Sequence, residues 1–296
     1  MTEKLRAYLY LHFCVLIWGF TAILGKLITL STLPLVWWRV FICSLTLWVI
    51  MQRTQVIHME RALFWRLFGI GALVGIHWIC FYGAIKLSNA SVAVASMATT
   101  AFFTAFTAPF FLKRAIKGYE LAIGILILPG MALLVGYIDW SMRIGFAVGV
   151  LGAFLAAVFS AMNKKIIDHQ PPPPLAMSFV ELSGACFVIT LILPFFKWLN
   201  PEVVLLPVGY DWIWLFVLAW ICTLIPYYLT LLSMRHISAF GTNLTINLEP
   251  VYGVLLAAWI FQENKVLHEG FYSGLLVILL AVFAHPFLKK WLDKDR

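Results

Sequence analysis

The feature of this sequence that most constrains its fold is the recurrence of long, uninterrupted apolar runs. Residues 120–138, for example, read ELAIGILILPGMALLVGYI, close to the ~20 residues that a helix needs to cross the hydrocarbon core of a bilayer. The strands of a membrane barrel would instead show short segments of alternating polarity. The runs therefore predict membrane-spanning helices and exclude a membrane barrel.

The composition agrees with a membrane protein. Hydrophobic residues make up 63% of the 296 residues and charged residues 11%, against about 25% charged in soluble domains, and the mean hydropathy is +0.95. These values exclude a soluble globular enzyme, a disordered chain and a secreted disulfide scaffold. The 5 Cys residues lie scattered in apolar runs without a C-x-x-C pair, which argues against disulfides and metal sites.

Ten apolar segments have the length of a membrane span. We expect transmembrane helices at residues 8–29, 34–52, 64–86, 90–112, 119–138, 145–164, 175–197, 211–233, 237–260 and 269–288. Lys4 and Arg6 precede the first segment as they would precede a signal peptide. Its apolar stretch is too long for a signal peptide, however, and no A-x-A cleavage site follows.

Positive charges are distributed unevenly over the loops between these segments. With a cytoplasmic N-terminus, most of the 21 Lys and Arg residues fall in cytoplasmic loops and termini, and Lys86, Arg143, Lys197 and Lys265 fall on the other side. Cytoplasmic loops of membrane proteins carry such an excess. We therefore interpret the net charge of +8 as a topology signal. It indicates a multi-pass protein of the plasma (bacterial inner) membrane with both termini cytoplasmic, and not a nucleic-acid partner.

The chain has the pattern of two repeats. Residues 88–120 and 237–269 both begin with a short Ser/Ala segment, continue through a Thr- or Ser-bearing run, and reach a polar break before a Glu. Five spans per half is an odd number, so the halves would have opposite orientations. We expect an all-α polytopic membrane protein of ten transmembrane helices in two inverted five-helix repeats, residues 1–141 and 142–296. Substrate would bind near the midplane between them.

A series of short motifs follows the same order along nearly the whole chain. They are Trp18-Gly19, Lys26, Arg39, Ile237-Ser238-Ala239, Leu248-Glu249-Pro250, Glu263 and Gly274. Their order and spacing resemble the drug/metabolite transporter superfamily, specifically its EamA-type ten-helix members. The first half departs from the family pattern, with Ala101 and Arg114 at the family's Pro and Glu positions. The resemblance implies a transporter that exports amino acids and other small metabolites. It also implies that Lys26 stands at a position that is often Lys in the family.

Glu249 is the ionisable residue placed deepest in an expected span. It lies about 12 residues into the ninth segment, or about 18 Å along a helix, near the bilayer midplane. Pro250 removes a backbone hydrogen bond, and freed carbonyls at this depth must line protein or water. Asn243 and Asn247, four residues apart, share one helix face. The pattern predicts a cavity-lining helix in which Glu249 binds substrate or a proton. The alternative is a polar contact that holds the helices together.

Arg39 and Glu181 occupy matching places in the two expected repeats, each several residues inside a span. A charge at such a depth should face a partner or a cavity. Arg39 would anchor a carboxylate and Glu181 an amine or a proton, or Arg39 would form a structural ion pair with Glu181 or Glu249. Lys26 lies near the end of the first span, where snorkelling to the interface is the alternative to a function. The four charges sum to zero, which suits a zwitterionic substrate.

Aromatic and polar neighbours complete the candidate site. His77 lies near Trp78 and Tyr82 in the third span, where a hydrogen bond inside the bundle is the alternative to a function. The Thr99, Thr100 and Thr104 group is interpreted as close helix packing. The candidate substrate-binding residues are Glu249, Arg39, Glu181, Asn243, Asn247, Lys26, Trp18, Tyr82 and His77, and Glu249 and Glu181 are also the candidate proton carriers.

The sequence contains no nucleotide-hydrolysis or hydrolase motif of the G-x-x-x-x-G-K-[ST], G-x-S-x-G or H-E-x-x-H type, and such motifs mark the corresponding chemistries. We expect no cofactor, no metal and no catalytic residue. The expected function is secondary active or facilitative export of small metabolites by alternating access, with protons as a further ligand and with a bundle compatible with a monomer. An intramembrane enzyme acting on lipid-linked substrates, or a carrier of nucleotide-linked or lipid-linked substrates, is the alternative.

Overall fold

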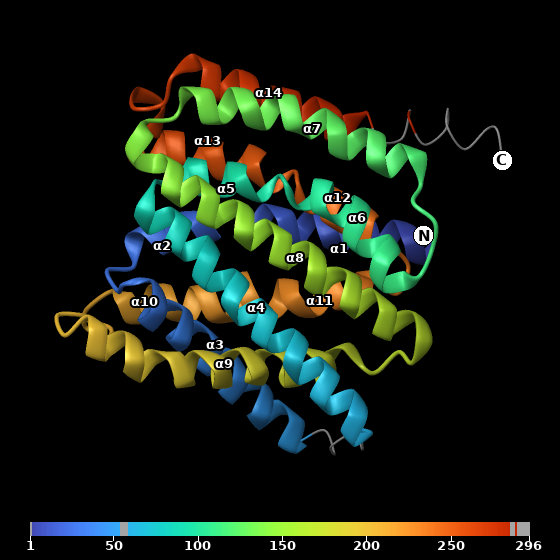
Figure 1. The fold of residues 1–296 in the computed structure, drawn as a ribbon. Coiled ribbons are helices and arrows are strands. Elements are labelled where there is room, and N and C mark those ends of the chain that lie inside the picture. The colour runs from blue at the N-terminus through green and yellow to red at the C-terminus, as the bar shows by residue number, and fades with distance from the viewer. Residues whose placement is uncertain (1, 54–58, 285–287, 289–296) are drawn as a thin grey trace.

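The computed structural model describes residues 2–53, 59–284 and 288, and within them it is built from helices without a β-strand (Figure 1). The α-helices are α1 (Glu3–Trp18), α2 (Thr21–Leu27), α3 (Thr32–Arg53), α4 (Arg61–Leu87), α5 (Ala90–Met97), α6 (Thr100–Leu112), α7 (Gly118–Tyr137), α8 (Arg143–His169), α9 (Pro174–Leu199), α10 (Asp211–Phe216), α11 (Ile225–Ser233), α12 (Ala239–Ile246), α13 (Glu249–Phe261) and α14 (Glu269–Phe283). A π-helical segment, η2 (Val217–Leu224), joins α10 to α11. Two 3₁₀ turns, η1 (Trp140–Met142) and η3 (Glu263–Lys265), lie in loops.

The predicted set of membrane spans is confirmed. Within the described residues, nine helical spans are long and apolar enough to cross a membrane, and the shorter apolar helix Glu269–Ala281 follows them. The first span begins at Glu3, earlier than expected. The expected tenth span, 269–288, extends over residues 285–287, which lie outside the described residues.

Two spans are interrupted in the same way, which the sequence-based boundaries do not show. The fourth consists of α5 with 8 residues and α6 with 13 residues, and the ninth consists of α12 with 8 residues and α13 with 13 residues. Each pair is separated by two residues, and each second helix ends at a left-handed residue, Lys113 (φ 50°) or Gln262 (φ 55°). The stretches 88–120 and 237–269, predicted to be repeats, therefore have the same arrangement of a short helix, a two-residue break and a longer helix.

The two interruptions have different local causes. In the ninth span, Pro250 lies in the first turn of α13, where its missing N–H costs nothing. The fourth span has Ala101 at the matching position. There Thr99 and Thr100 donate their hydroxyl hydrogens to the carbonyls of Ser96 (2.9 Å) and Met97 (2.7 Å), bonds that compete with a regular helix. The departure from the family motif in the first half thus leaves the break in place.

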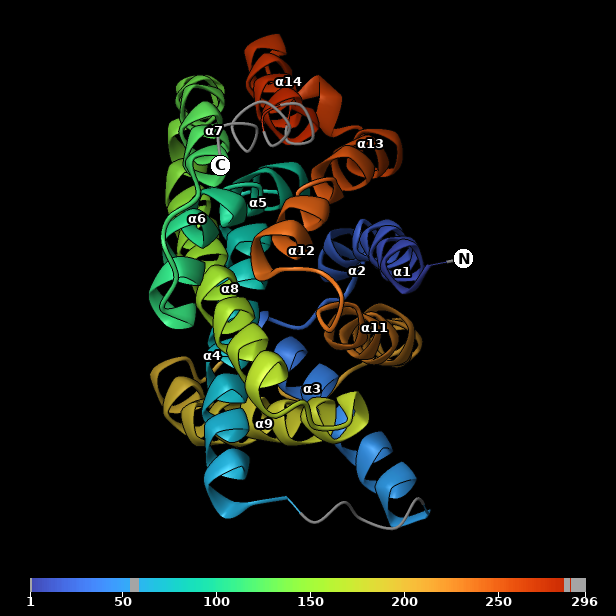
Figure 2. The same ribbon diagram turned by 90° about the vertical axis from the view of Figure 1, so that its right-hand side faces the viewer.

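Helices of the first half pack against helices of the second half throughout the bundle. The pairs α4 with α9, α1 with α11, α5 with α13 and α7 with α14 all make extensive contact. Figure 2 shows α5 and α12 between the α7–α14 pair and the α3, α4 and α9 helices. A Cβ atom at Gly130 would lie 2.7 Å from the Gly274 carbonyl oxygen. Glycine therefore permits α7 and α14 to meet backbone to backbone, as small residues do in membrane bundles.

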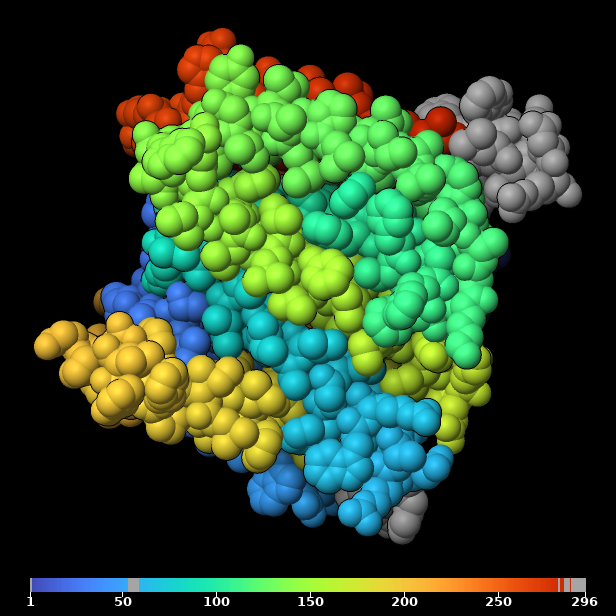
Figure 3. All heavy atoms as spheres, viewed as in Figure 1, coloured from blue at the N-terminus to red at the C-terminus, as the bar shows by residue number. Residues whose placement is uncertain are grey.

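The bundle has two ends, defined by its loops. Figure 1 shows the N-terminus, the α6–α7 and α8–α9 connections and the last described turns of α14 at one end, which we call the N-terminal side. The α2–α3, α9–α10 and α13–α14 connections lie at the other end, the opposite side. In the space-filling view of Figure 3, α7, α8 and α4 cover one flank. Large side chains such as Trp259, Phe110 and Leu191 are exposed, as lipid-facing residues are.

Candidate functional site

A cavity of about 120 Å³ lies where helices of the two halves meet. Both broken helices contribute residues from their breaks, Met97 and Thr100 from one, and Ile246, Glu249 and Pro250 from the other. A cavity of this volume has room for several water-sized spheres, each of about 10–15 Å³.

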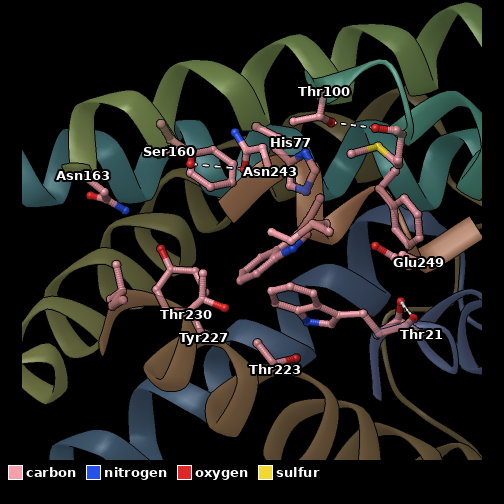
Figure 4. A pocket seen from close by; sticks show the side chains of 18 of the residues that line it. Thr21, His77, Thr100, Ser160, Asn163, Thr223, Tyr227, Thr230, Asn243 and Glu249 are labelled. Atoms are coloured by element: carbon pink, nitrogen blue, oxygen red, sulfur yellow. Dashed lines mark hydrogen bonds between the residues drawn. The ribbon is translucent and has the colours of Figure 1, made fainter. Parts of the chain in front are cut away.

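Glu249 occupies the break of the ninth span and lines this cavity. The residue is 8% exposed. In the part of the chain that the structure describes, its carboxyl group has no hydrogen-bond or salt-bridge partner. Figure 4 shows it with Thr21 at one end of the cavity, whereas Tyr227, Thr230 and Asn163 lie at the other end. A carboxyl group without a hydrogen-bond or salt-bridge partner is available to a ligand in the cavity.

Arg39 lines the cavity from α3 and is held by neutral groups. It is 2% exposed, and its Nε donates to Thr223 Oγ1 (2.6 Å) and its Nη1 to the Tyr82 hydroxyl (3.0 Å). The guanidinium lies 4.1 Å from the ring centroid of Trp78, a favourable cation–π distance. Among the described residues it forms no salt bridge, so the expected alternative of an ion pair with Glu181 or Glu249 is wrong.

Thr223, whose hydroxyl oxygen accepts the hydrogen bond from Arg39, belongs to the π-helical segment η2. Thr223 Oγ1 donates onward to the carbonyl of Leu218, five residues earlier (2.6 Å). Pro226 follows shortly afterwards. π-Helices are rare, and short π segments occur frequently at functional sites. Thr223 in this segment accepts the hydrogen bond from Arg39, and the hydrophobic periodicity of the sequence does not predict a π-helical turn here.

Glu181 is 0% exposed and lies behind the wall of the cavity. Its Oε2 accepts a hydrogen bond from Asn163 Nδ2 (3.1 Å) and one from the Tyr227 hydroxyl. Both of those partners line the cavity. The structure therefore separates the two predicted glutamates. Glu249 faces the cavity directly, and Glu181 reaches it through Tyr227 and Asn163.

The predicted asparagines have different places. Asn243 lines the cavity, accepts from Ser160 Oγ (3.2 Å) and donates to Thr104 Oγ1 (2.8 Å). Asn247 lies in the break of the ninth span and donates to the carbonyl of Ala98 in the break of the fourth span (2.7 Å). Asn243 is thus placed to contact a ligand, and Asn247 ties the two breaks together.

The predicted aromatic residues divide in a similar way. Trp18 and His77 line the cavity, whereas Tyr82 supports Arg39 from behind. His77 Nδ1 lies 2.8 Å from the Gly152 carbonyl oxygen, and because a carbonyl only accepts, Nδ1 carries the hydrogen. The hydrogen-bonded alternative for His77 is therefore observed, although the ring also faces the cavity.

Lys26 lies away from the cavity, at the opposite side of the bundle. Its Nζ is 2.8 Å from Glu263 Oε1, and Glu263 also accepts from the Ser91 N–H (3.0 Å) and hydroxyl (2.6 Å). Burial raises the pKa of Glu263, but these hydrogen bonds outweigh it and hold the pKa below its usual range. A second contact joins Thr29 to Asp211. Lys26 therefore connects the two halves through Glu263.

Several cavity residues are absent from the sequence-based site. They are Thr21, Phe81, Met97, Thr100, Phe159, Ser160, Asn163, Thr223, Tyr227 and Thr230. Thr100, interpreted from sequence as a packing residue, lines the cavity at the break of the fourth span. Its position matches that of Glu249 in the aligned repeats, which is the signal that could have identified it.

Comparison with known proteins agrees with this architecture. The model of the EamA-like transporter family matches residues 5–136 and 143–285. The chain belongs to the EamA-like transporter family. It is therefore a membrane transporter of the drug/metabolite transporter superfamily, and the match covers both halves. The exact boundary between residues 141 and 142 stays a prediction.

Comparison with solved structures supports the fold. One chain, described as "Crystal structure of protein", aligns with a TM-score of 0.68 at 16% sequence identity, over 98% of this chain and 98% of that chain. At this identity the likeness concerns the fold alone. No curated protein sequence matches the chain significantly.

Proposed function

We propose that this EamA-family protein is a secondary transporter that exports small metabolites such as amino acids. Substrate binds in the cavity between the repeats, and rocking of the repeats exposes it alternately to the two sides of the membrane, as in other inverted-repeat transporters. The membrane is the plasma (bacterial inner) membrane, with the N-terminal side cytoplasmic. The excess of Lys and Arg in the loops of that side supports this orientation. The protein acts as a monomer in this proposal.

The observation that carries the proposal is the unpartnered Glu249 carboxyl group at the break of α12 and α13. A charge at this depth in a membrane is costly unless something neutralises it. The cavity offers the space for that partner to be a ligand. A substrate amine is one such group, and a proton is another.

Arg39 supplies the complementary charge in the same cavity. Its guanidinium is fixed by Thr223, Tyr82 and Trp78. No carboxylate among the described residues forms a salt bridge with it. A zwitterion could place its carboxylate towards Arg39 and its amine towards Glu249. Trp18, Trp78, Phe81 and Phe159 provide apolar surface for the rest of the molecule.

Counterflow uptake in proteoliposomes tests the proposal. Vesicles loaded with a pool of unlabelled L-amino acids are diluted into the same pool in labelled form. Wild-type protein should accumulate label, and Glu249→Gln should reduce the rate by about tenfold or more, because a charge-assisted hydrogen bond contributes about 1.5–3 kcal/mol. Glu269→Gln, which changes an exposed glutamate at the start of α14, is the matched control.

The possible outcomes separate the parts of the proposal. Wild-type vesicles that accumulate none of the labelled amino acids contradict the assigned substrate class. Full counterflow by Glu249→Gln contradicts the role of Glu249. Loss of counterflow in Glu269→Gln would show that the assay responds to the loss of any carboxylate.

A further inference from the structure

Glu181 has an environment that no part of the substrate-binding scheme uses. Its side chain is completely buried in α9, and one of its oxygens, Oε1, has no hydrogen-bond partner in the described structure. The other oxygen accepts hydrogen bonds from two neutral groups, Tyr227 and Asn163. A buried carboxylate ordinarily has a cation beside it, and none of the described Lys, Arg or His side chains forms a salt bridge with Glu181.

The carboxyl group of Glu181 is enclosed by protein, since Oε1 is buried and Oε2 accepts hydrogen bonds from two side chains. On one side, α4 packs directly on its backbone, since a Cβ atom at Gly71 would lie 1.9 Å from the Glu181 carbonyl oxygen. On the other side, Tyr227 and Asn163 separate the carboxyl group from the cavity. A substrate amine therefore has no route to Glu181, whereas a phenol hydroxyl both donates and accepts hydrogen bonds.

The titratable groups near Glu181 are few. Of the elements around Glu181, α11 provides Tyr227, α4 provides His77 and Tyr82, α3 provides Arg39 and Cys43, and α8, which carries Asn163, provides Lys164. His77 is bonded to Gly152, Arg39 to Tyr82 and Thr223, and Lys164 to the Met234 carbonyl and Asp168. Tyr227 is thus the titratable side chain of the described residues that contacts the Glu181 carboxyl group.

The first repeat contains a counterpart of this pair with the opposite charge. Arg39 of α3 is bonded to Tyr82 of α4, and Glu181 of α9 is bonded to Tyr227 of α11. These are the second and third spans of each repeat. The cavity-lining Trp78 joins the two pairs, since its ring lies 4.1 Å from the Arg39 guanidinium and 6.1 Å from the Tyr227 ring. Of the two pairs, only Glu181 with Tyr227 can take up a proton, because the arginine of the other pair is already protonated.

We propose that Glu181 binds the coupling proton and that Tyr227 transfers it from the cavity, whereas Glu249 binds substrate. Tyr227 passes its hydroxyl proton to Glu181 and takes one proton from the cavity, so the phenol is regenerated and the carboxylate becomes a carboxylic acid. The division of roles rests on the proposed transport function. It predicts that one proton and one substrate bind at separate places in the same cycle.

Transport driven by a pH gradient tests this division of roles. In proteoliposomes supplied with a pool of labelled L-amino acids, one coupled proton and a gradient of one pH unit support up to about a tenfold concentration ratio. Glu181→Gln should accumulate label equally with and without the gradient. Tyr227→Phe should respond to the gradient more slowly than wild type, and Glu269→Gln should respond as wild type does. A wild-type response in Glu181→Gln would overturn the proposal.

Infrared spectroscopy of the purified protein provides a readout that needs no substrate. On acidification in detergent, wild-type protein should gain protonated-carboxyl absorption, and Glu181→Gln should lack one buried-carboxyl component of that band that Glu269→Gln retains. Persistence of the complete band in Glu181→Gln would overturn the proposal. If wild-type vesicles transport none of the amino acids while the band behaves as expected, the substrate assignment fails and the proton site stands.

Discussion

At the scale of single residues, the position of Arg39 depends on the shape of its side chain as well as on its charge. Arg39→Lys keeps the charge but cannot reproduce two directed donors and a planar face against Trp78. The variant leaves the Thr223 and Tyr82 hydroxyls without their charged donor. We expect it to lower the stability by about 1.5–3 kcal/mol, measured as thermal unfolding of the purified protein in detergent. Lys165→Arg, which alters an exposed side chain of α8, is the control, and an unchanged midpoint for Arg39→Lys contradicts the interpretation.

The same residues show what sequence alone can identify in the site. Arg39 and Glu249 are conspicuous because charges are rare within apolar runs, and the structure places both on the cavity. Thr223 and Tyr227 are ordinary helix residues in sequence. Their importance arises from a π-helical turn and from a contact with Glu181 on another span. Such contacts depend on helix rotation and tilt, which a hydrophobic pattern does not determine.

At the scale of elements, the connection between α2, α5 and η3 on the opposite side depends on the charge of Glu263. Because its folded-state pKa is lowered, the carboxylate stabilises the fold above the unfolded-state pKa, near 4.3. That stabilisation is lost as the pH falls through the folded-state value. Glu263→Gln should therefore unfold at a lower temperature than wild type at neutral pH, and the two should converge as the pH falls through the lowered folded-state pKa of Glu263. Glu202→Gln, in the exposed loop of the same side, should follow wild type throughout. A difference that is constant over this pH range would exclude an electrostatic origin.

The interruptions of the helices mark the limit of sequence-based prediction at this scale. The existence of each span follows from its apolar length, and the structure confirms the set. The break before Glu249 was foreseeable because Pro250 follows it. The break between α5 and α6 has no proline and arises from threonine hydroxyls bonded to nearby carbonyls. Threonine is common inside membrane helices, so its presence alone does not predict a break.

At the scale of the whole molecule, the inverted arrangement follows from the odd number of spans in each repeat. The sequence therefore predicts that the two halves face each other across a central site. The sequence does not predict which residues of the two halves contact each other in a given conformation of the transporter. In this structure the opposite side carries several such contacts, among them Lys26 with Glu263, Thr29 with Asp211 and Trp38 with the carbonyl of Leu205. The proposed rocking of the repeats requires that these contacts open.

Chemical cross-linking of the repeats tests whether the whole molecule works in this way. A bifunctional thiol reagent that joins Lys26→Cys to Glu263→Cys ties the first repeat to the second, and we expect counterflow to fall to background. Cleavage of the cross-link should restore it. The control pair is Arg114→Cys with Glu120→Cys, which replaces a 2.6 Å salt bridge inside the first repeat and should tolerate cross-linking. If the joined Lys26–Glu263 pair continues to transport at the uncross-linked rate, the repeats do not separate on the opposite side. Substrate would then have to leave the cavity without the rocking motion that the inverted fold implies.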